Sequence, residues 1–122
     1  MIGYTTLGTN DLKRAGAFYD ALLAEMGAKR AMEMETFIAW ATAPNTPMVA
    51  VIKPFDGKAA TVGNGVMVAL AASSKEQVNA LHKKALALGG KDEGAPGPRG
   101  PGFYAGYFRD LDGNKLNAFF MG

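Results

Sequence analysis

Hydrophobic and polar positions in the first half of the chain predict a strand, a helix and then three strands. Residues 2–7 are mostly apolar or β-favouring, and the polar run 9–11 is typical of a helix start. Apolar side chains then recur every three or four positions from Leu12 to Met26, and Gly27 stands where a left-handed helix cap is expected. Three further strands are predicted at residues 28–34, 36–41 and 48–53.

The second half begins with the same order of elements. Residues 65–71 predict a strand, and Ser73 with Glu76 forms a capping box at the start of a helix. Apolar residues at three- and four-residue spacing continue from Val78 to Leu88, before a pair of glycines. The sequence therefore predicts a second strand and helix of the same kind.

The end of the chain predicts a loop and a hairpin. Segment 94–102 consists of Gly, Pro, Ala and one Arg, too little apolar side chain for a core, so we expect a surface loop. A lid over a pocket is the alternative. Residues 103–110 and 114–121 are strand-like and flank Asp-Gly at 112–113, a strong hairpin signal, so an antiparallel pair is expected there.

The two halves superpose at an offset of 63 positions. The helix start and the glycine after the helix are 17 positions apart in both halves, from Asn10 to Gly27 (27 − 10) and from Ser73 to Gly90 (90 − 73). This spacing indicates a structural repeat. The offset also aligns apolar positions with one another: Leu7 with Leu70, Ala15 with Val78, Phe18 with Leu81 and Leu22 with Ala85.

Composition indicates a globular protein and gives no sign of binding to nucleic acid or membranes. A chain of 122 residues, 48% hydrophobic and 20% charged, is typical of one globular domain. The net charge of +2 is small and scattered, so neither nucleic acid nor an anionic membrane is an expected partner. No segment has the pattern of a membrane span or a secretory signal, so we expect a cytoplasmic protein. The absence of cysteine fits that location.

Few catalytic groups are available. Without cysteine there are no disulfides, thiolate metal sites or cysteine nucleophiles. His82 is the only histidine, so a two-histidine metal site is excluded. Because His82 falls off the apolar face of its helix, we expect it to be solvated rather than a general base. Arg99, the one charge in the Gly-Pro segment, has two interpretations: an exposed loop arginine, which we favour, or a clamp for a ligand carboxylate.

Three segments carry a resemblance to a known family. Residues 1–23 contain Met-Ile-Gly-Tyr, then Thr-Asn-Asp-Leu and Ala-Phe-Tyr-Asp-Ala-Leu-Leu; residues 63–71 and the hairpin 103–116 are the other two. They resemble the first strand and helix, the fifth strand and the final hairpin of the vicinal oxygen chelate superfamily, which comprises glyoxalases, bleomycin-resistance proteins and extradiol dioxygenases.

The resemblance implies an α+β fold. In it, two βαβββ modules, here residues 1–57 and 63–122 of a single domain, form curved mixed sheets around a cavity, and a homodimer completes the sheets. In the family's metalloenzymes, a divalent metal is held by residues on the first, fifth and last strands. Those positions here are Tyr4, Met67 and Asn117, and the offset of 63 aligns Pro54 with Asn117 (117 − 63).

These four side chains are poor ligands for a hard divalent metal. A neutral phenol and a thioether suit such ions badly, proline has no side-chain donor, and only the Asn117 amide coordinates, weakly. We therefore expect no metal and no other cofactor, which disfavours metal-dependent glyoxalase and dioxygenase activity. Whether any reaction is catalysed stays open, and no catalytic residue is assigned.

A ligand pocket is nevertheless expected inside the sheets. Strand residues two apart share a face, so Tyr4 and Met67 point inward with their neighbours, and the aromatic C-terminal hairpin offers rings for stacking on a flat ligand. The residues expected to line the pocket are Tyr4, Thr6, Trp40, Met67, Ala69, Tyr104, Tyr107, Asn117 and Phe119.

Three functions follow from these expectations. We favour a metal-independent, bleomycin-resistance-like homodimer that binds a small aromatic or amphipathic molecule in an apolar cavity. The alternative is an enzyme of the glyoxalase or dioxygenase type, a lyase or isomerase, with an unconventional or metal-free site. A scaffold whose pocket is filled by its own side chains is the third.

Overall fold

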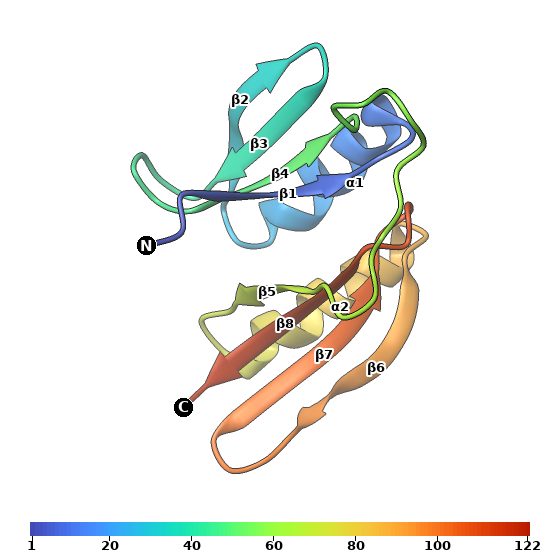
Figure 1. Cartoon of the computed structure of the whole chain (residues 1–122). Coiled ribbons are helices and arrows are strands. Elements are labelled where there is room, and N and C mark those ends of the chain that lie inside the picture. The colour runs from blue at the N-terminus through green and yellow to red at the C-terminus, as the bar shows by residue number, and fades with distance from the viewer.

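The computed structural model describes all 122 residues, as two modules with the same order of elements (Figure 1). Each module contains one strand, one helix and three more strands. The first comprises β1 (Tyr4–Gly8), α1 (Leu12–Ala24), β2 (Lys29–Met34), β3 (Phe37–Ala41) and β4 (Met48–Ile52). The second comprises β5 (Val68–Ala71), α2 (Lys75–Ala87), β6 (Lys91–Pro98), β7 (Phe103–Arg109) and β8 (Lys115–Met121).

Each module forms its own four-stranded mixed sheet. The strand orders are β1-β4-β3-β2 and β5-β8-β7-β6. In both, the first strand pairs with the last in parallel, and the remaining neighbours are antiparallel. The predicted α+β fold of two βαβββ modules is confirmed.

The helices show the predicted repeat. Asp11 caps α1 by accepting a hydrogen bond from the Arg14 amide, and Ser74 caps α2 in the same way from the Gln77 amide. The two caps are 63 positions apart (74 − 11). The predicted capping pair was wrong by one residue: Ser74 is the N-cap, and the side chain that reaches back is that of Gln77, not Glu76, accepting from the amide of Ser73.

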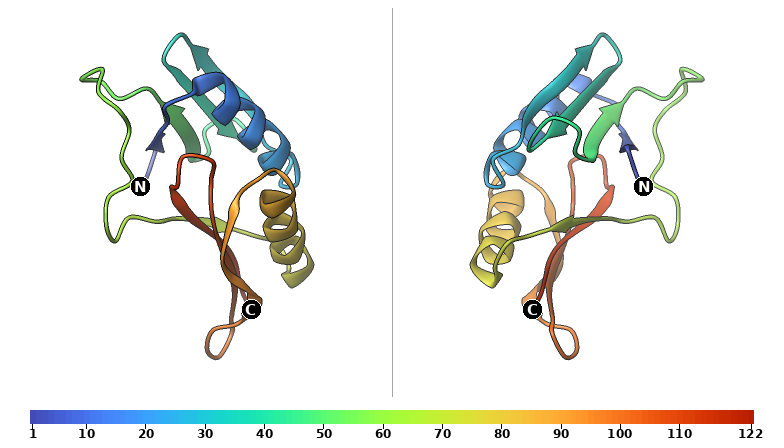
Figure 2. Two further views of the ribbon diagram at one scale, coloured as in Figure 1. Left: turned by 90° about the vertical axis from the view of Figure 1, so that its right-hand side faces the viewer. Right: turned by 90° about the vertical axis from the view of Figure 1, so that its left-hand side faces the viewer.

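One continuous core joins the modules. The two helices lie side by side along one flank, while the linker between β4 and β5 runs on the opposite side (Figure 2). Between the helices and the sheets, apolar residues of both modules form a single cluster, in which Leu7, Trp40 and Val51 of the first pack with Leu70 and Phe108 of the second. The modules therefore fold as one unit.

The sheet faces turned away from the helices are partly uncovered, and we call them the first and second open faces. Strand alternation and register place Tyr4, Thr6, Phe37, Met48 and Ala50 on the first, with Met32 and Met34 opposite Ala39 and Phe37. Tyr4 is 58% exposed and Met34 is 54% exposed. Apolar side chains thus remain in solvent on this face.

The Gly-Pro segment is not the loop that its composition predicted. Its first part lies in β6, which pairs with β7, and only residues 99–102 form the turn. β6 is an edge strand with two register shifts, so the missing amide hydrogens of Pro96 and Pro98 need not interrupt the sheet. Glycine at position 94 (φ +155°) permits the irregular backbone.

The predicted alignment of Pro54 with Asn117 was also wrong. Thr6 pairs with Ala50 across β1 and β4, and Ala69, 63 positions after Thr6 (69 − 6), pairs with Asn117 across β5 and β8. The counterpart of Asn117 is therefore Ala50, 67 positions earlier (117 − 50). The offset grows mainly because the β6–β7 hairpin, in its strands and in its turn, is longer than the β2–β3 hairpin.

Candidate functional site

The three positions that the family resemblance assigns to metal ligands lie on two different sheets. Tyr4 is on the first open face, where its ring meets Phe37 edge-to-face at 5.9 Å between centroids. Met67 immediately precedes β5, and Asn117 is on β8 of the second sheet. Asn117 is only 2% exposed, and its Oδ1 has no hydrogen-bond donor.

The donor chemistry of these positions does not fit the family's divalent metal. Beside the phenol of Tyr4, the thioether of Met67 and the amide of Asn117, the fourth position carries the methyl group of Ala50. Nowhere in the chain do three His, Cys, Asp or Glu side chains come together in a way that could hold a metal ion. Hard divalent ions prefer carboxylate and other oxygen ligands, and borderline ions such as Zn²⁺ and Ni²⁺ prefer imidazole or thiolate, so this set offers no complete coordination shell for either kind.

An apolar cavity of about 570 Å³ lies between the modules. We call it the inter-module cavity. It lies where the end of α1 and the strand ends of the first sheet approach β5, and 13 of its 16 lining residues are hydrophobic. Both the volume and the apolar lining fall within the range of small-molecule sites.

The cavity includes three of the predicted pocket residues, Trp40, Met67 and Ala69. Trp40 belongs mainly to the core, since it is 2% exposed and its indole Nε1 donates to Asp20 Oδ1 at 2.8 Å. Sequence reasoning missed Thr5. Its hydroxyl is buried without a partner while the residue lines the cavity, and alternation along β1 is the signal that separates it from Tyr4 and Thr6.

The C-terminal aromatic residues do not form one wall. Phe103, Tyr107 and Phe119 lie on the second open face, where Phe103 and Phe119 stack at 5.6 Å between centroids. The alternate residues pack toward α2, and the Tyr104 hydroxyl donates to Asn79 Oδ1 on that helix at 2.7 Å. The structure therefore does not bring Tyr104 together with Tyr107, because strand residues three apart face opposite sides.

A row of paired residues crosses the second open face. Ala69 on β5 is opposite Asn117 on β8, Asn117 is opposite Tyr107 on β7, and Tyr107 is opposite Gly94 on β6. Because Ala69 also lines the inter-module cavity, the row leads from that cavity to the edge strand. Two cations lie against the Tyr107 ring: the Arg99 guanidinium at 5.6 Å and the Lys115 ammonium at 5.5 Å from its centroid.

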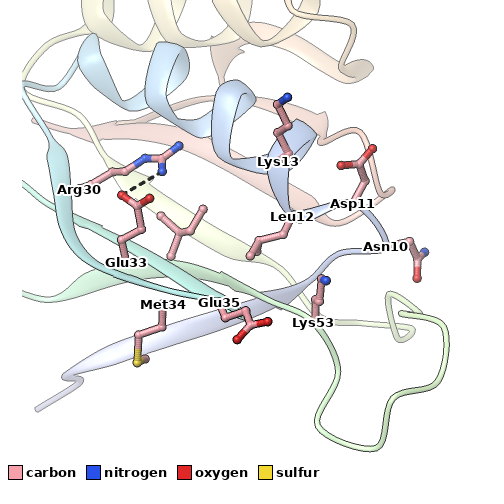
Figure 3. Close-up of a pocket in the computed structure, with 10 residues that line it drawn as sticks. Asn10, Asp11, Leu12, Lys13, Arg30, Glu33, Met34, Glu35 and Lys53 are labelled. Atoms are coloured by element: carbon pink, nitrogen blue, oxygen red, sulfur yellow. Dashed lines mark ion pairs between the residues drawn. The ribbon is translucent and has the colours of Figure 1, made fainter.

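A second pocket, between the start of α1 and β2, is polar and carries both signs of charge (Figure 3). Arg30 lines one side of this polar pocket. Its guanidinium forms two hydrogen bonds with Asp20, at 2.9 and 2.8 Å, and an ion pair with Glu33 at 3.2 Å. The bonds from Arg30, and secondarily from Trp40, lower the pKa of Asp20, while Asp20 raises the pKa of Arg30. Arg30 is thus already neutralised by the protein's own carboxylates.

The prediction that His82 is solvated was wrong. His82 is 6% exposed, its ring packs against Phe108, and its Nε2 lies 3.1 Å from Asp92 Oδ1 at the start of β6. Helix α2 places the His82 side chain against β6, and the absence of a side chain at Gly106 on β7 leaves space for the imidazole ring. The Gly94 amide, and then His82, lower the pKa of Asp92. The pair ties α2 to β6, on the side of the sheet away from the second open face.

The architecture places this chain among α+β proteins built from two βαβββ modules. A family model described as Glyoxalase/Bleomycin resistance protein/Dioxygenase superfamily matches residues 1–118, and the chain belongs to that superfamily. None of the curated proteins compared with the chain matches it. Neither helix is long and apolar enough to span a membrane.

Solved structures support the same assignment. A glyoxalase/bleomycin resistance protein from Albidiferax ferrireducens T118 is 35% identical, with a TM-score of 0.90 over 100% of this chain and 99% of that one. A family enzyme from Burkholderia phytofirmans PsJN is 18% identical (TM-score 0.79; 98% of each chain). A lactoylglutathione lyase from Agrobacterium tumefaciens is 21% identical (TM-score 0.71; 98% of this chain, 92% of that one). The last two share the fold.

Proposed function

We propose that this protein binds a small aromatic or amphipathic molecule in the inter-module cavity without a metal ion. The observation that carries the proposal is the cavity itself, apolar over most of its lining and large enough for such a molecule. The buried Thr5 hydroxyl, which has no partner in the protein, offers a hydrogen bond that would orient a ligand. We place the protein in the cytoplasm, which agrees with its lack of cysteine.

Metal independence is supported by the donor set. Tyr4, Met67 and Ala50 at these positions do not provide the fixed set of coordinating groups that a catalytic metal requires. The Asn117 amide keeps one oxygen but no charge. The remaining chemistry of the site is hydrogen bonding, stacking and apolar contact, which suffices for binding.

The working form in this proposal is a homodimer in which the open faces of two copies cover one another. The first open face exposes Tyr4, Met32 and Met34, and Met67 beside the second is 40% exposed. Apolar groups gathered on one face in this way are typical of an interaction surface. A second copy would bury them and close the open side of each sheet.

The test is a fluorescence titration with N-phenylnaphthylamine, a neutral aromatic probe, in the presence of a chelator. The proposal predicts saturable binding that is unaffected by chelation. Ala69→Phe, which fills the cavity, should weaken binding by about tenfold or more through steric exclusion. The matched control is Ala87→Phe, at the exposed end of α2, which should bind like the parent. Binding that needs an added metal, or that Ala69→Phe leaves unchanged, would refute the proposal.

A further inference from the structure

We propose that the second open face carries an anion-recognition subsite, formed by Arg99 and Lys115 on either side of the Tyr107 position, and that the ligand of the inter-module cavity is an amphipathic carboxylate. The inference rests on the proposed function and adds the charge and shape of the ligand. Its basis is the arrangement of charged side chains around the row that leads out of the cavity.

Arg99 is held in place by the protein while its charge stays unpaired. Its Nη2 donates to the Ala95 carbonyl at 2.7 Å and its Nη1 to the Pro98 carbonyl at 3.4 Å. None of the ion pairs in the structure includes Arg99. Carbonyl groups orient a guanidinium without neutralising it, so it remains available to an anion.

The glycines of β6 leave the space that the Arg99 guanidinium occupies. A Cβ at position 94 would lie 3.4 Å from Arg99 Nη2, and one at position 97 would lie 3.2 Å from Nη1. Gly94 is also the residue opposite Tyr107 in the sheet. The Gly-Pro segment thus lets the Arg99 side chain fold back over the edge strand and onto the Tyr107 ring.

Cations outnumber anions on this face. Lys115 lies against the same ring and forms no ion pair. Arg109, next along β7 on this face, is paired with Glu93 at 2.9 Å. Two uncompensated cations therefore flank Tyr107, an arrangement that favours an anionic group.

The row sets the distance between the two parts of the ligand. Neighbouring strands are about 4.8 Å apart, so Tyr107 lies two strands, or roughly 10 Å, from the cavity wall at Ala69. A ligand with its apolar body in the cavity would reach Arg99 and Lys115 with a carboxylate at that distance. The buried Asn117 Oδ1, midway along the row and without a donor, would accept a hydrogen bond from a hydroxyl or amine of the ligand.

The test compares two probes that share one ring system. Dansylaminoundecanoic acid carries its carboxylate at the end of a long alkyl chain, so the anion can reach Arg99 and Lys115 while the ring lies in the cavity, and its methyl ester is the neutral probe. We expect the anion to bind more tightly than the neutral probe at low ionic strength, and the difference to shrink as salt is added. Arg99→Gln and Lys115→Gln should each weaken binding of the anion about fivefold and leave the neutral probe unchanged.

Lys83→Gln is the control, since Lys83 is an exposed residue of α2, on the other side of the sheet. It should change neither affinity. Equal binding of both probes, or unchanged anion affinity in both the Arg99 and Lys115 variants, would overturn the subsite while leaving the cavity proposal intact. If the neutral probe itself fails to bind, the proposed function fails, and the subsite that rests on it fails with it.

Discussion

The hydroxyl of Tyr19 donates a 2.6 Å hydrogen bond to Oδ2 of Asp110, linking α1 of the first module to the final hairpin of the second, 91 positions later in the chain. Asp110 is 6% exposed and also accepts from the Asp112 amide and from the amide and side chain of Asn114. This buried carboxylate therefore organises the hairpin turn and fastens it to the other module.

Replacing Tyr19 by Phe should remove one of the bonds to the buried carboxylate. Because a hydrogen bond to a charged acceptor contributes about 1.5–3 kcal/mol, we expect the free energy of unfolding to fall by roughly that amount. Urea denaturation measures the change. Tyr4→Phe is the control, since the Tyr4 hydroxyl makes no hydrogen bond within the chain, and it should stay within about 0.5 kcal/mol of the parent.

The same pair predicts a dependence on alkaline pH. Burial first, and then the negative charge of Asp110, raise the pKa of Tyr19 well above its ordinary value of 10.0. A raised pKa gives a stabilising contribution that is complete below the unfolded value and is lost as pH rises toward the folded one. The tyrosinate absorbance of Tyr19 should therefore appear only as the protein unfolds. If the absorbance change that accompanies alkaline unfolding is smaller by one tyrosine in Tyr19→Phe, the assignment to Tyr19 is confirmed. If the change is the same size in that variant, another tyrosine produces it.

Asn117 should matter for binding rather than for stability. Since its buried Oδ1 has no donor, Asn117→Leu removes an uncompensated polar atom and should leave the unfolding free energy within about 1 kcal/mol of the parent or raise it. Asn114→Leu is the matched comparison. The Asn114 side chain donates to Gly8 O and to Asp110 Oδ2, so its loss should cost about 2 kcal/mol or more. Similar losses in both variants would contradict this account.

The local elements and the module repeat could be predicted from the sequence, because helix caps, apolar spacing and the Asp-Gly turn act over a few residues. The long-range pairings could not. The offset of 63 holds through β1, α1 and their counterparts but becomes 67 at Ala50 and Asn117, because the β6–β7 hairpin is longer than the β2–β3 hairpin in both strands and turn. No periodicity in one sequence reveals that change.

The site was predicted in part, for a related reason. The alternation of side chains along a strand places Tyr107 on the same face as Phe103 and Tyr104 on the opposite face. It does not show which of the two faces is turned toward the helix. That Tyr104 packs toward α2 depends on Asn79, and that Arg99 reaches Tyr107 depends on a glycine strand that the composition presents as a loop. Interactions of this kind require the tertiary structure.

Gly106 should tolerate no side chain. A Cβ there would approach Pro96 Cγ at 3.0 Å and His82 Cδ2 at 3.3 Å, where β6, β7 and α2 meet. We expect Gly106→Ala to destabilise the protein by about 1–3 kcal/mol through overpacking. Gly3→Ala, which has no atom within 4 Å of the new methyl group, should be neutral in the same thermal or urea measurement. An unchanged free energy of unfolding in Gly106→Ala would contradict this prediction and would show that β6 moves to accommodate the methyl group.

The proposed dimer makes a separate prediction. The double variant Met32→Lys, Met34→Lys places two charges on the first open face, where the parent side chains are 46% and 54% exposed. If a second copy covers this face, burying the charges should raise the dimer dissociation constant by about a hundredfold or more. Analytical ultracentrifugation measures the shift, with Glu76→Lys on exposed α2 as the charge control. A monomeric parent protein would remove this part of the proposal.

The central claim, binding without a metal, is tested most directly by measuring metal content. The protein would be purified without an affinity tag and its bound metal quantified by mass spectrometry, before and after incubation with Ni, Zn, Mn and Fe(II) and removal of free ions. The replacement of the family's ligands by Tyr4, Met67, Ala50 and Asn117 predicts only trace metal in every sample, with N-phenylnaphthylamine still bound. One equivalent of any of these metals per chain would contradict the account.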